Sequence, residues 1–246
     1  MNNINKLVVV LGLLFTSSAF ADFGRCNDFF PQKHAPKVTS AVTNGKVTRE
    51  LCFSNFAILY SVDSKTPVYA VERLSYLTIG RKEPRTNHFH EEPMLRPSER
   101  STLADYKGSG YDRGHNAPAG DMNLPLSMEE SFSMVNLAPQ SSHMNRGPWA
   151  KSVEIPTRKY VARSAGDVFV FTGGYFIPNQ QRKTIGANHV WVPDYFYKLV
   201  YDSQTKRAWA YFMANTDEAR ASRPITYQEL SQKIGMQLLD GLEVKN

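Results

Sequence analysis

The feature that most limits the fold is a series of short apolar runs, each of strand length and each ended by a turn. Val, Tyr and Leu are frequent in these runs, which is typical of β-strands. The runs lie at 53–60, 68–77, 167–171, 190–192, 195–201 and 208–213. Helical spacing is found at 127–136, 143–153 and 226–239. Strands interleaved with helices in this way predict one α+β domain, and the first two runs predict a hairpin.

Composition excludes several other classes of protein. The 246 residues are 41% hydrophobic and 21% charged, which is enough for one sizeable core and excludes a disordered chain. No internal repeat, heptad or low-complexity tract is present. The formal net charge of +6 suits an anionic partner. Two cysteines are too few for a disulfide scaffold or a cysteine-based zinc site.

The first residues have the organisation of a secretory signal peptide. Lys6 provides a positive start, Leu7 to Phe15 is apolar, and Ala19-Phe20-Ala21 has the small-x-small form of a cleavage site. Nine apolar residues are too few to cross a bilayer core of about 30 Å. We therefore predict cleavage near Ala21 and a periplasmic or secreted mature protein without a membrane span.

The mature chain is expected to consist of an N-terminal arm, residues 22–50, and one domain, residues 51–246. Cys26 and Cys52 both remain after cleavage, and an even pair in an oxidising compartment predicts a disulfide between them. Closing this loop is worth roughly 3–4 kcal/mol. The alternative is two independent buried thiols.

Two segments contain the residue types expected of a site that binds a phosphate group. Arg113 and His115 alternate within Asp112-Arg113-Gly114-His115, so on a strand they share a face, and Asp112 points to the other face. The arginine would bind phosphate and lower the pKa of the histidine, which keeps the imidazole neutral. The second segment, 133–154, holds Asn136, Gln140 and Asn145, whose amide oxygens are ligands for hard cations such as Mg²⁺.

The two segments together resemble the DNA/RNA non-specific endonucleases with a ββα-metal (His-Me finger) active site. The resemblance rests on DRGH followed about thirty residues later by the N-x-x-P-Q…N-x-G-x-W segment. It continues through blocks at 170–174, 192–198 and 210–215, so that it spans residues 60 to 215. It implies a central, mostly antiparallel sheet flanked by helices, with a ββα-metal finger.

The resemblance also implies roles for individual residues. His115 would be the general base, Asn145 the direct ligand of Mg²⁺, and Arg113 the group that stabilises the charged transition state. Asn136 and Gln140 match supporting positions. Upstream, Arg85 is the best match to a substrate-binding arginine, and Arg81 is its rival. The family often has a glutamate four residues after the tryptophan, where this chain has Val153, and Glu154 follows one residue later.

The activity expected from this resemblance is hydrolysis of phosphodiester bonds in DNA and RNA without sequence specificity, with 5′-phosphate products. Mg²⁺ is the expected cofactor, with Mn²⁺ or Ca²⁺ as substitutes. A homodimer is compatible with the sequence, and an inhibitor partner has no signal in it. The alternatives are a non-catalytic nucleic-acid-binding protein on the same fold and a phosphatase or phosphodiesterase for small molecules.

The charged loop at 80–100 leaves two further questions open. Lys82, Arg85, Arg96 and Arg100 form either a basic face for nucleic acid or a solvated loop. His88 and His90 beside Glu91 and Glu92 have no third ligand at fixed spacing, so a zinc site there is disfavoured.

Overall fold

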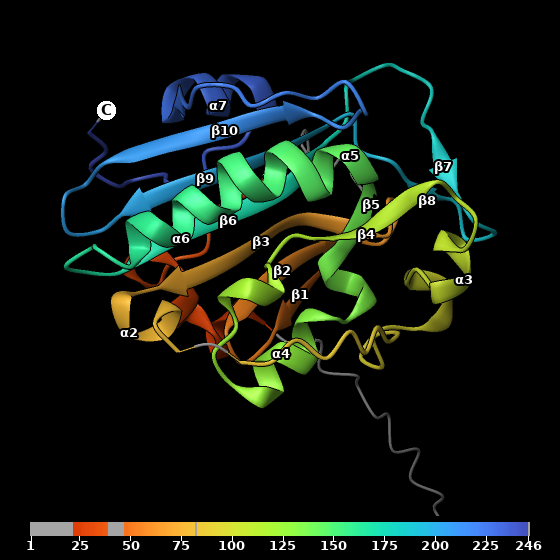
Figure 1. Ribbon diagram of the computed structural model, residues 1–246, viewed down its shortest axis with the longest axis horizontal. Helices are drawn as coiled ribbons and strands as arrows, with labels where there is room; N and C mark the ends of the chain where they lie inside the picture. Colours follow the sequence, from red (N-terminus) through yellow and green to blue (C-terminus); the bar gives the residue numbers. More distant parts are fainter. Residues whose placement is uncertain (1–21, 39–46, 82, 246) are drawn as a thin grey trace, which may run out of the picture.

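The protein is described by a computed structural model that covers residues 22–38, 47–81 and 83–245. The predicted signal segment 1–21 lies outside the described residues. Within them, the chain forms a large sheet with helices on both sides (Figure 1). None of the described helices has the length and apolarity needed to cross a membrane.

Eleven strands are found in the described residues. They are β1 (Thr48–Cys52), β2 (Phe56–Ser61), β3 (Thr66–Leu74), β4 (Tyr111–His115), β5 (Leu137–Ser141), β6 (Val168–Tyr175), β7 (Thr184–Ile185), β8 (Val190–Trp191), β9 (Tyr195–Asp202), β10 (Ala208–Ala214) and β11 (Ile225–Thr226). Seven of them form one sheet in the order β1-β2-β3-β6-β9-β10-β11, and every pairing in it is antiparallel. The predicted α+β fold with an antiparallel sheet is confirmed, as is the β2–β3 hairpin.

The helices are short. They are α2 (Tyr76–Ile79), α3 (Leu103–Tyr106), α4 (Pro125–Ser131), α5 (Ser142–Met144), a π-helical segment (Asn145–Glu154), α6 (Ile155–Val161) and α7 (Tyr227–Ile234). The predicted helices at 127–136 and 226–239 are longer than the observed ones. In α7, Thr226 accepts a hydrogen bond from the Glu229 amide at 3.1 Å and begins the helix, and Gly235 at φ 69° ends it.

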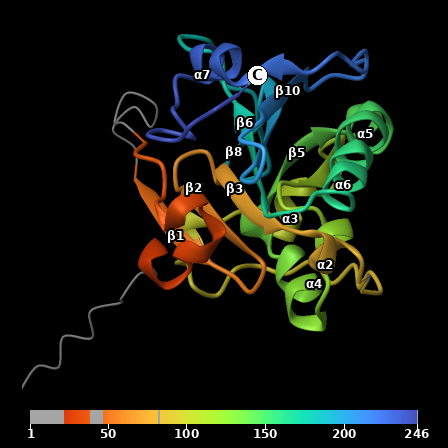
Figure 2. The same cartoon turned by 90° about the vertical axis from the view of Figure 1, so that its left-hand side faces the viewer.

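Alternation along the central strands divides the core into two sides. On β3, Tyr69 and Val71 pack with α7 and with the N-terminal turns, which are three short 3-10 helices at Phe23–Arg25, Asn27–Phe29 and Pro31–Lys33. Ala70 packs with α4 and the segment after β4. Figure 2 shows α5 and α6 on one side of the sheet and the N-terminal turns on the other. The β4–β5 pair lies on the same side as α5 and α6, and it is separate from the large sheet.

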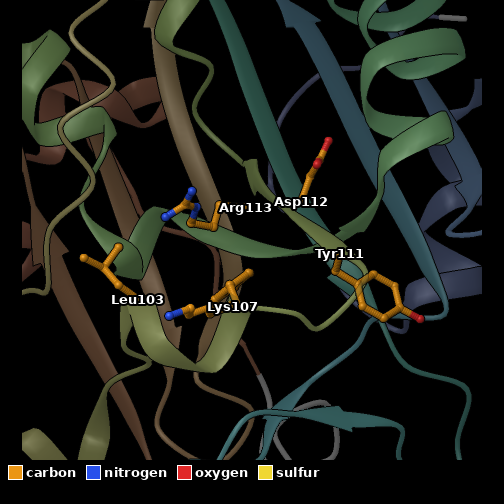
Figure 3. Close-up of a pocket in the computed structure, with 6 residues that line it drawn as sticks. Leu103, Lys107, Tyr111, Asp112 and Arg113 are labelled. Carbon is orange, nitrogen blue, oxygen red and sulfur yellow. The ribbon is translucent and has the colours of Figure 1, made fainter.

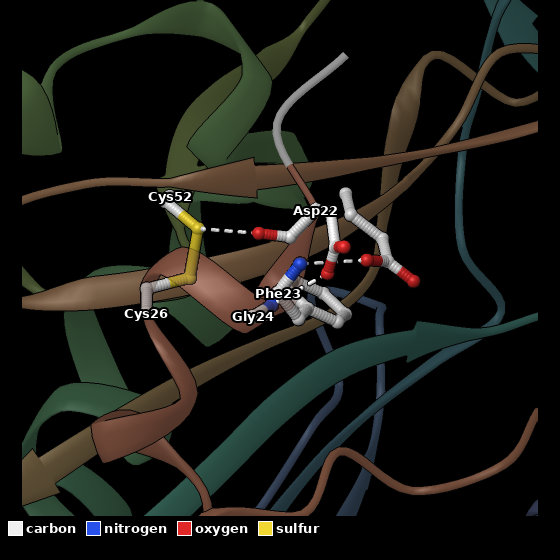
Figure 4. The surroundings of a disulfide bond; sticks show 6 residues. Asp22, Phe23, Gly24, Cys26 and Cys52 are labelled. Carbon is white, nitrogen blue, oxygen red and sulfur yellow. Dashed lines mark hydrogen bonds between the residues drawn. A yellow bond between two sulfur atoms is a disulfide. The ribbon is translucent and has the colours of Figure 1, made fainter. Parts of the chain in front are cut away.

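The N-terminal arm is part of this core. A disulfide joins Cys26 to Cys52 of β1, as predicted (Figure 4). Beside it, the Phe23 amide donates to Glu50 at 2.8 Å, and Phe23 and Phe30 pack on Tyr69. Strand β1 begins at Thr48, inside the range that the sequence assigned to the arm, because residues 48–52 pair with β2.

We predict that the Cys26→Ser/Cys52→Ser double variant unfolds more easily. The disulfide closes a loop across a sequence separation of 26 residues. Its loss should lower the free energy of unfolding by about 3 kcal/mol, because the unfolded chain regains conformational entropy. Urea unfolding checks this. Wild-type protein unfolded under reducing conditions should match the variant, and equal stability of oxidised and reduced wild type would contradict the prediction.

Candidate active site

The first motif forms β4, which pairs with β5 in antiparallel register. Asp112 lies opposite Gln140, and His115 lies opposite Leu137. Gly114 is required by this pairing, since a Cβ at that position would lie 2.1 Å from the Gln140 side chain. The Gln140 side chain is fully buried, so it has little room to move. The glycine therefore allows the two strands of the motif to pack closely.

Asp112 joins the two sequence motifs. Its carboxylate accepts hydrogen bonds from Asn145 Nδ2 at 2.9 Å, Ser142 Oγ at 2.8 Å and Arg146 Nε at 2.8 Å. Burial alone would raise the pKa of Asp112, but these hydrogen bonds outweigh it and lower the pKa. The ionised carboxylate thus holds the start of the π-helical segment against β4.

His115 and Asn145 are connected through β4 without touching each other. Within the described residues, no hydrogen bond or ring contact joins the imidazole directly to Asn145. They are linked through Asp112, which lies three residues before His115 on β4. The contact holds Asn145 against the strand that carries His115.

Two phenylalanines hold the basic side chains around His115. The His115 ring meets Phe132 edge-on at 5.0 Å and lies 6.0 Å from Phe89. The Arg113 guanidinium lies 4.1 Å from the Phe89 ring centroid, and that of Arg85 lies 4.8 Å from the Phe132 centroid. Phe89 and Phe132 contact each other at 4.9 Å. This aromatic pair fixes three cationic or titratable groups in one place.

His115 is held in its neutral form. Burial first, and then the positive charge of Arg85, lower the pKa of His115 to about 3. The atom Nε2 is buried and has no hydrogen-bond partner among the described residues. The sequence assigned this shift to Arg113; the structure instead identifies burial and Arg85. A neutral imidazole with an unpartnered ring nitrogen can accept a proton.

The loop before α3 reaches the site through backbone pairing. The His90 amide donates to the Phe132 carbonyl at 3.2 Å, and the Met134 amide donates to the His90 carbonyl at 2.8 Å. This pairing brings Arg85 to the Phe132 ring beside His115. Both Arg85 and its rival Arg81 are exposed, but no such contact is found for Arg81 among the described residues. Of the other basic residues that the sequence grouped with Arg85, Arg96 pairs with Glu99 and Arg100 pairs with Glu91. Two of the four grouped basic residues are therefore ion-paired, and Lys82 lies outside the described residues.

The two histidines of this loop face an acidic side chain. Nδ1 of His88 and Nδ1 of His90 lie 3.5 Å and 3.8 Å from the carboxylate oxygens of Glu129. No group of three metal-ligating His, Cys, Asp or Glu side chains occurs in the described parts of the chain. Within the described residues, the loop therefore has no metal site made of three such side chains.

The π-helical segment explains the shifted glutamate. A π-helix closes its hydrogen bonds from i to i+5, so it places one residue more per turn than an α-helix. Val153 is fully buried in an apolar cluster with Trp149, and Glu154 faces a group of charges instead. Burial raises the pKa of Glu154, and Lys198 and Arg158 oppose that rise. The extra residue therefore turns the Glu154 side chain away from the apolar cluster and toward the charged side chains of Lys198 and Arg158.

Glu154 belongs to a charged cluster between the sheet and the site. Arg158 Nη1 lies 2.9 Å from Asp121, and its Nη2 lies 3.9 Å from Glu154. Glu72 of β3 is 1% exposed, and neither of its carboxylate oxygens has a hydrogen-bond partner in the described part of the chain. Burial, and then the negative charge of Asp121, raise the pKa of Glu72 well above its usual value. Lys198 of β9 is also buried and donates to Thr172 at 2.6 Å.

Asn136 and Gln140 act on the backbone of the motif. The Asn136 side chain bonds the carbonyl and the amide of Ala117, each at 2.9 Å, and the carbonyl of Ser131 at 2.9 Å. Its donors and its acceptor are all used, so it fixes the chain just after His115. Gln140 packs against Gly114, and neither atom of its buried amide has a partner in the described residues.

The donor set at Asn145 fits a hard divalent cation. Its amide nitrogen is held by Asp112, which leaves Oδ1 without a hydrogen bond from the described residues. A neutral amide oxygen suits Mg²⁺ or a similar ion when water and phosphate oxygens complete the coordination. The residues present can therefore hold such an ion as a single protein ligand.

Sequence reasoning missed several residues of this site. Strand alternation correctly places Asp112 on the face of β4 away from His115. That pattern does not predict the contact between Asp112 and Asn145. Arg158 follows Glu154 by four residues, a helical spacing that could have found it. The pairing of Phe89 with Phe132 had no local signal, because 43 residues separate them.

A strand pair carrying an imidazole, followed by a helical segment that presents an amide oxygen, defines the class of ββα-metal nucleases. The family model described as DNA/RNA non-specific endonuclease matches residues 34–245. The chain belongs to this family, whose members are nuclease enzymes that depend on a divalent cation.

Individual relatives agree with this assignment. The chain is 32% identical over 156 residues to human "Endonuclease G, mitochondrial", covering 59% of this chain and 52% of that protein. It is 34% identical over 172 residues to "Nuclease C1" of Cunninghamella echinulata, covering 63% and 68%. The chain thus spans about half the length of the mitochondrial relative.

A solved structure shares the fold. The crystal structure of a complex of EndoG with EndoGI, described as showing the mechanism of EndoG inhibition, superposes with a TM-score of 0.75 and 23% identity. The match covers 92% of this chain and 96% of that one. It extends the similarity over nearly the whole chain at the level of fold.

We predict that Gly114→Ala destabilises the protein by about 1–3 kcal/mol, because the new methyl group would overlap the buried Gln140 side chain. Urea unfolding measures the change. Gly147→Ala is the matched control, since a Cβ there meets nothing within 4 Å. In Gly114→Ala/Gln140→Ala the loss should be smaller than the sum of the two single losses. Equal effects of the two single glycine variants would contradict the close-packing argument.

Proposed function

We propose that the protein is an exported endonuclease that hydrolyses phosphodiester bonds of DNA and RNA without sequence specificity and uses Mg²⁺. The observation that carries the proposal is the Asp112–Asn145 contact, which holds the proposed amide ligand against the strand that carries the imidazole. Membership of the family supports the reaction, and the net charge of +6 suits a polyanionic substrate.

Asn145 would hold the cation through Oδ1. When bound, the cation offsets negative charge on the phosphate and on the leaving oxygen. Asp112 keeps the Asn145 amide in the orientation that presents this oxygen. Arg146 neutralises the Asp112 carboxylate, so that it does not repel the substrate. Mn²⁺ or Ca²⁺ would bind the same oxygen donors.

His115 would act as the general base. Its imidazole is neutral, so it can accept the proton of the attacking water. The aromatic pair Phe89 and Phe132 holds the ring in place while the proton moves. The attacking water would lie in line with phosphorus and the leaving 3′-oxygen. Because the 3′-oxygen leaves, the products would carry 5′-phosphate ends.

Arg113 and Arg85 would stabilise the charge that develops on the phosphate. The Arg113 guanidinium stacks on Phe89 and forms no ion pair within the described residues, so its N–H groups remain available. Such preorganised cations act most strongly where charge grows in the transition state. Contacts of this kind address only the sugar–phosphate backbone, so they would allow both DNA and RNA as substrates.

The proposal that the protein is exported rests on the N-terminal sequence and on the two cysteines. A signal peptide over residues 1–21, cleaved near Ala21, would send residues 22–246 to the periplasm or the medium, as an arm of 22–50 and a nuclease domain of 51–246. The Cys26–Cys52 disulfide supports this proposal, since disulfides persist in oxidising compartments. Export would also separate the nuclease from the nucleic acids of its own cell.

We expect plasmid DNA and total RNA to be digested in Mg²⁺ and to stay intact with EDTA. His115→Ala and Asn145→Ala should each lower the rate at least about 100-fold, because one removes the base and the other the cation ligand. His34→Ala, an exposed histidine of the N-terminal arm, is the control. Full digestion with EDTA or by His115→Ala would refute the mechanism, and salt-sensitive binding without cleavage would favour a non-catalytic role.

The pH profile gives a separate test. The pKa of His115 lies below 6.5, so the base stays deprotonated as the pH falls through 6.5. The acid limb of kcat/KM, which reports the free enzyme, should therefore lie below pH 6.5. Arg85→Met removes the second cause of the shift and should move that limb to higher pH. A wild-type limb at pH 6.5 or above would contradict the assignment.

A further inference from the structure

A hollow of about 320 Å³ adjoins the site on the side of α3. It is lined by Leu103, Tyr106, Lys107, Tyr111, Asp112 and Arg113. In Figure 3 the cationic ends of Lys107 and Arg113 point to the same side, and Tyr111 points away from them. The hollow therefore begins at the motif itself and continues to Lys107, which the proposed mechanism does not use.

Lys107 is an exposed cation with no anionic partner in the described parts of the chain, in contrast to Arg146, whose charge Asp112 neutralises. Its backbone is nonetheless held in place, because the Lys107 amide donates to the Ala104 carbonyl at 3.2 Å and the turn beside it is hydrogen-bonded. Ser109 Oγ donates to the Tyr106 carbonyl at 2.9 Å and accepts from the Tyr111 amide at 3.2 Å. A free charge on an anchored turn suits a fixed anionic group of a ligand.

On the other side of Tyr111 the charge is reversed. A second hollow of about 500 Å³ is lined in part by Asp194, Asp217 and Glu218. Its lysine, Lys183, lies 5.0 Å from the Tyr111 ring centroid. A nucleic-acid backbone carries a negative charge at every nucleotide, so the acidic hollow repels it and the hollow at Lys107 attracts it.

We infer that the hollow beside α3 binds the phosphate that neighbours the scissile phosphate, and that Lys107 is its contact. The bound strand then leaves the active site over α3 and away from the acidic hollow. Leu103, which is 39% exposed at the same hollow, offers an apolar surface to a sugar or base. This subsite rests on the proposed nuclease function. Lys107 recognises charge and Leu103 offers only apolar surface, so the subsite adds affinity without sequence preference.

The test compares Lys107→Met with wild type on long DNA over a series of salt concentrations. At low salt, kcat/KM should fall about tenfold in the variant, as expected for one charge-assisted contact. The slope of log kcat/KM against log salt concentration should become shallower by about 1. The kcat at saturating DNA should stay unchanged, because Lys107 does not touch the scissile phosphate.

Two control variants accompany it. Lys107→Arg keeps the charge and should restore the wild-type slope. Lys37→Met removes an exposed lysine of the N-terminal arm and should leave the slope unchanged. An unaltered salt slope in Lys107→Met, or a loss confined to kcat, would overturn the subsite. Absence of any cleavage by wild-type protein would instead overturn the proposed nuclease function, so the two failures are distinguishable.

Discussion

The site depends on one partly buried carboxylate. Asp112 stands on β4 and accepts hydrogen bonds from Ser142, Asn145 and Arg146 at the start of the following helical segments. Without it, nothing described in the structure would fix the Asn145 amide against the strand that carries His115. An ionised carboxylate can do this because its two oxygens accept several hydrogen bonds at once, and Arg146 balances its charge.

The second constraint is the layer of aromatic and charged groups on which this centre rests. Phe89 and Phe132 come from different loops, yet together they hold His115, Arg113 and Arg85. Burial, and then the positive charge of Arg85, keep the imidazole neutral. The same packing thus produces a base and two cations side by side.

The large antiparallel sheet positions these parts without contributing the reacting groups. One face is covered by the N-terminal turns and α7, and the other supports the β4–β5 pair and the helical segments. The disulfide attaches the arm to the edge strand β1. Glu72 and Lys198 project from the sheet toward the site, where they form a buried charged cluster with Asp121, Glu154 and Arg158.

The sequence by itself determined the fold class, the strand runs, the disulfide pair and the two motifs, because these follow from local periodicity and from residue types at short spacing. It placed Arg113 and His115 on one face of a strand for the same reason. It could not determine which residue joins the motifs, why Glu154 is shifted by one position, or which groups set the pKa of His115. Those features arise from contacts between segments tens of residues apart and from a π-helical turn whose hydrogen bonds leave no local pattern, so only the tertiary structure decided them.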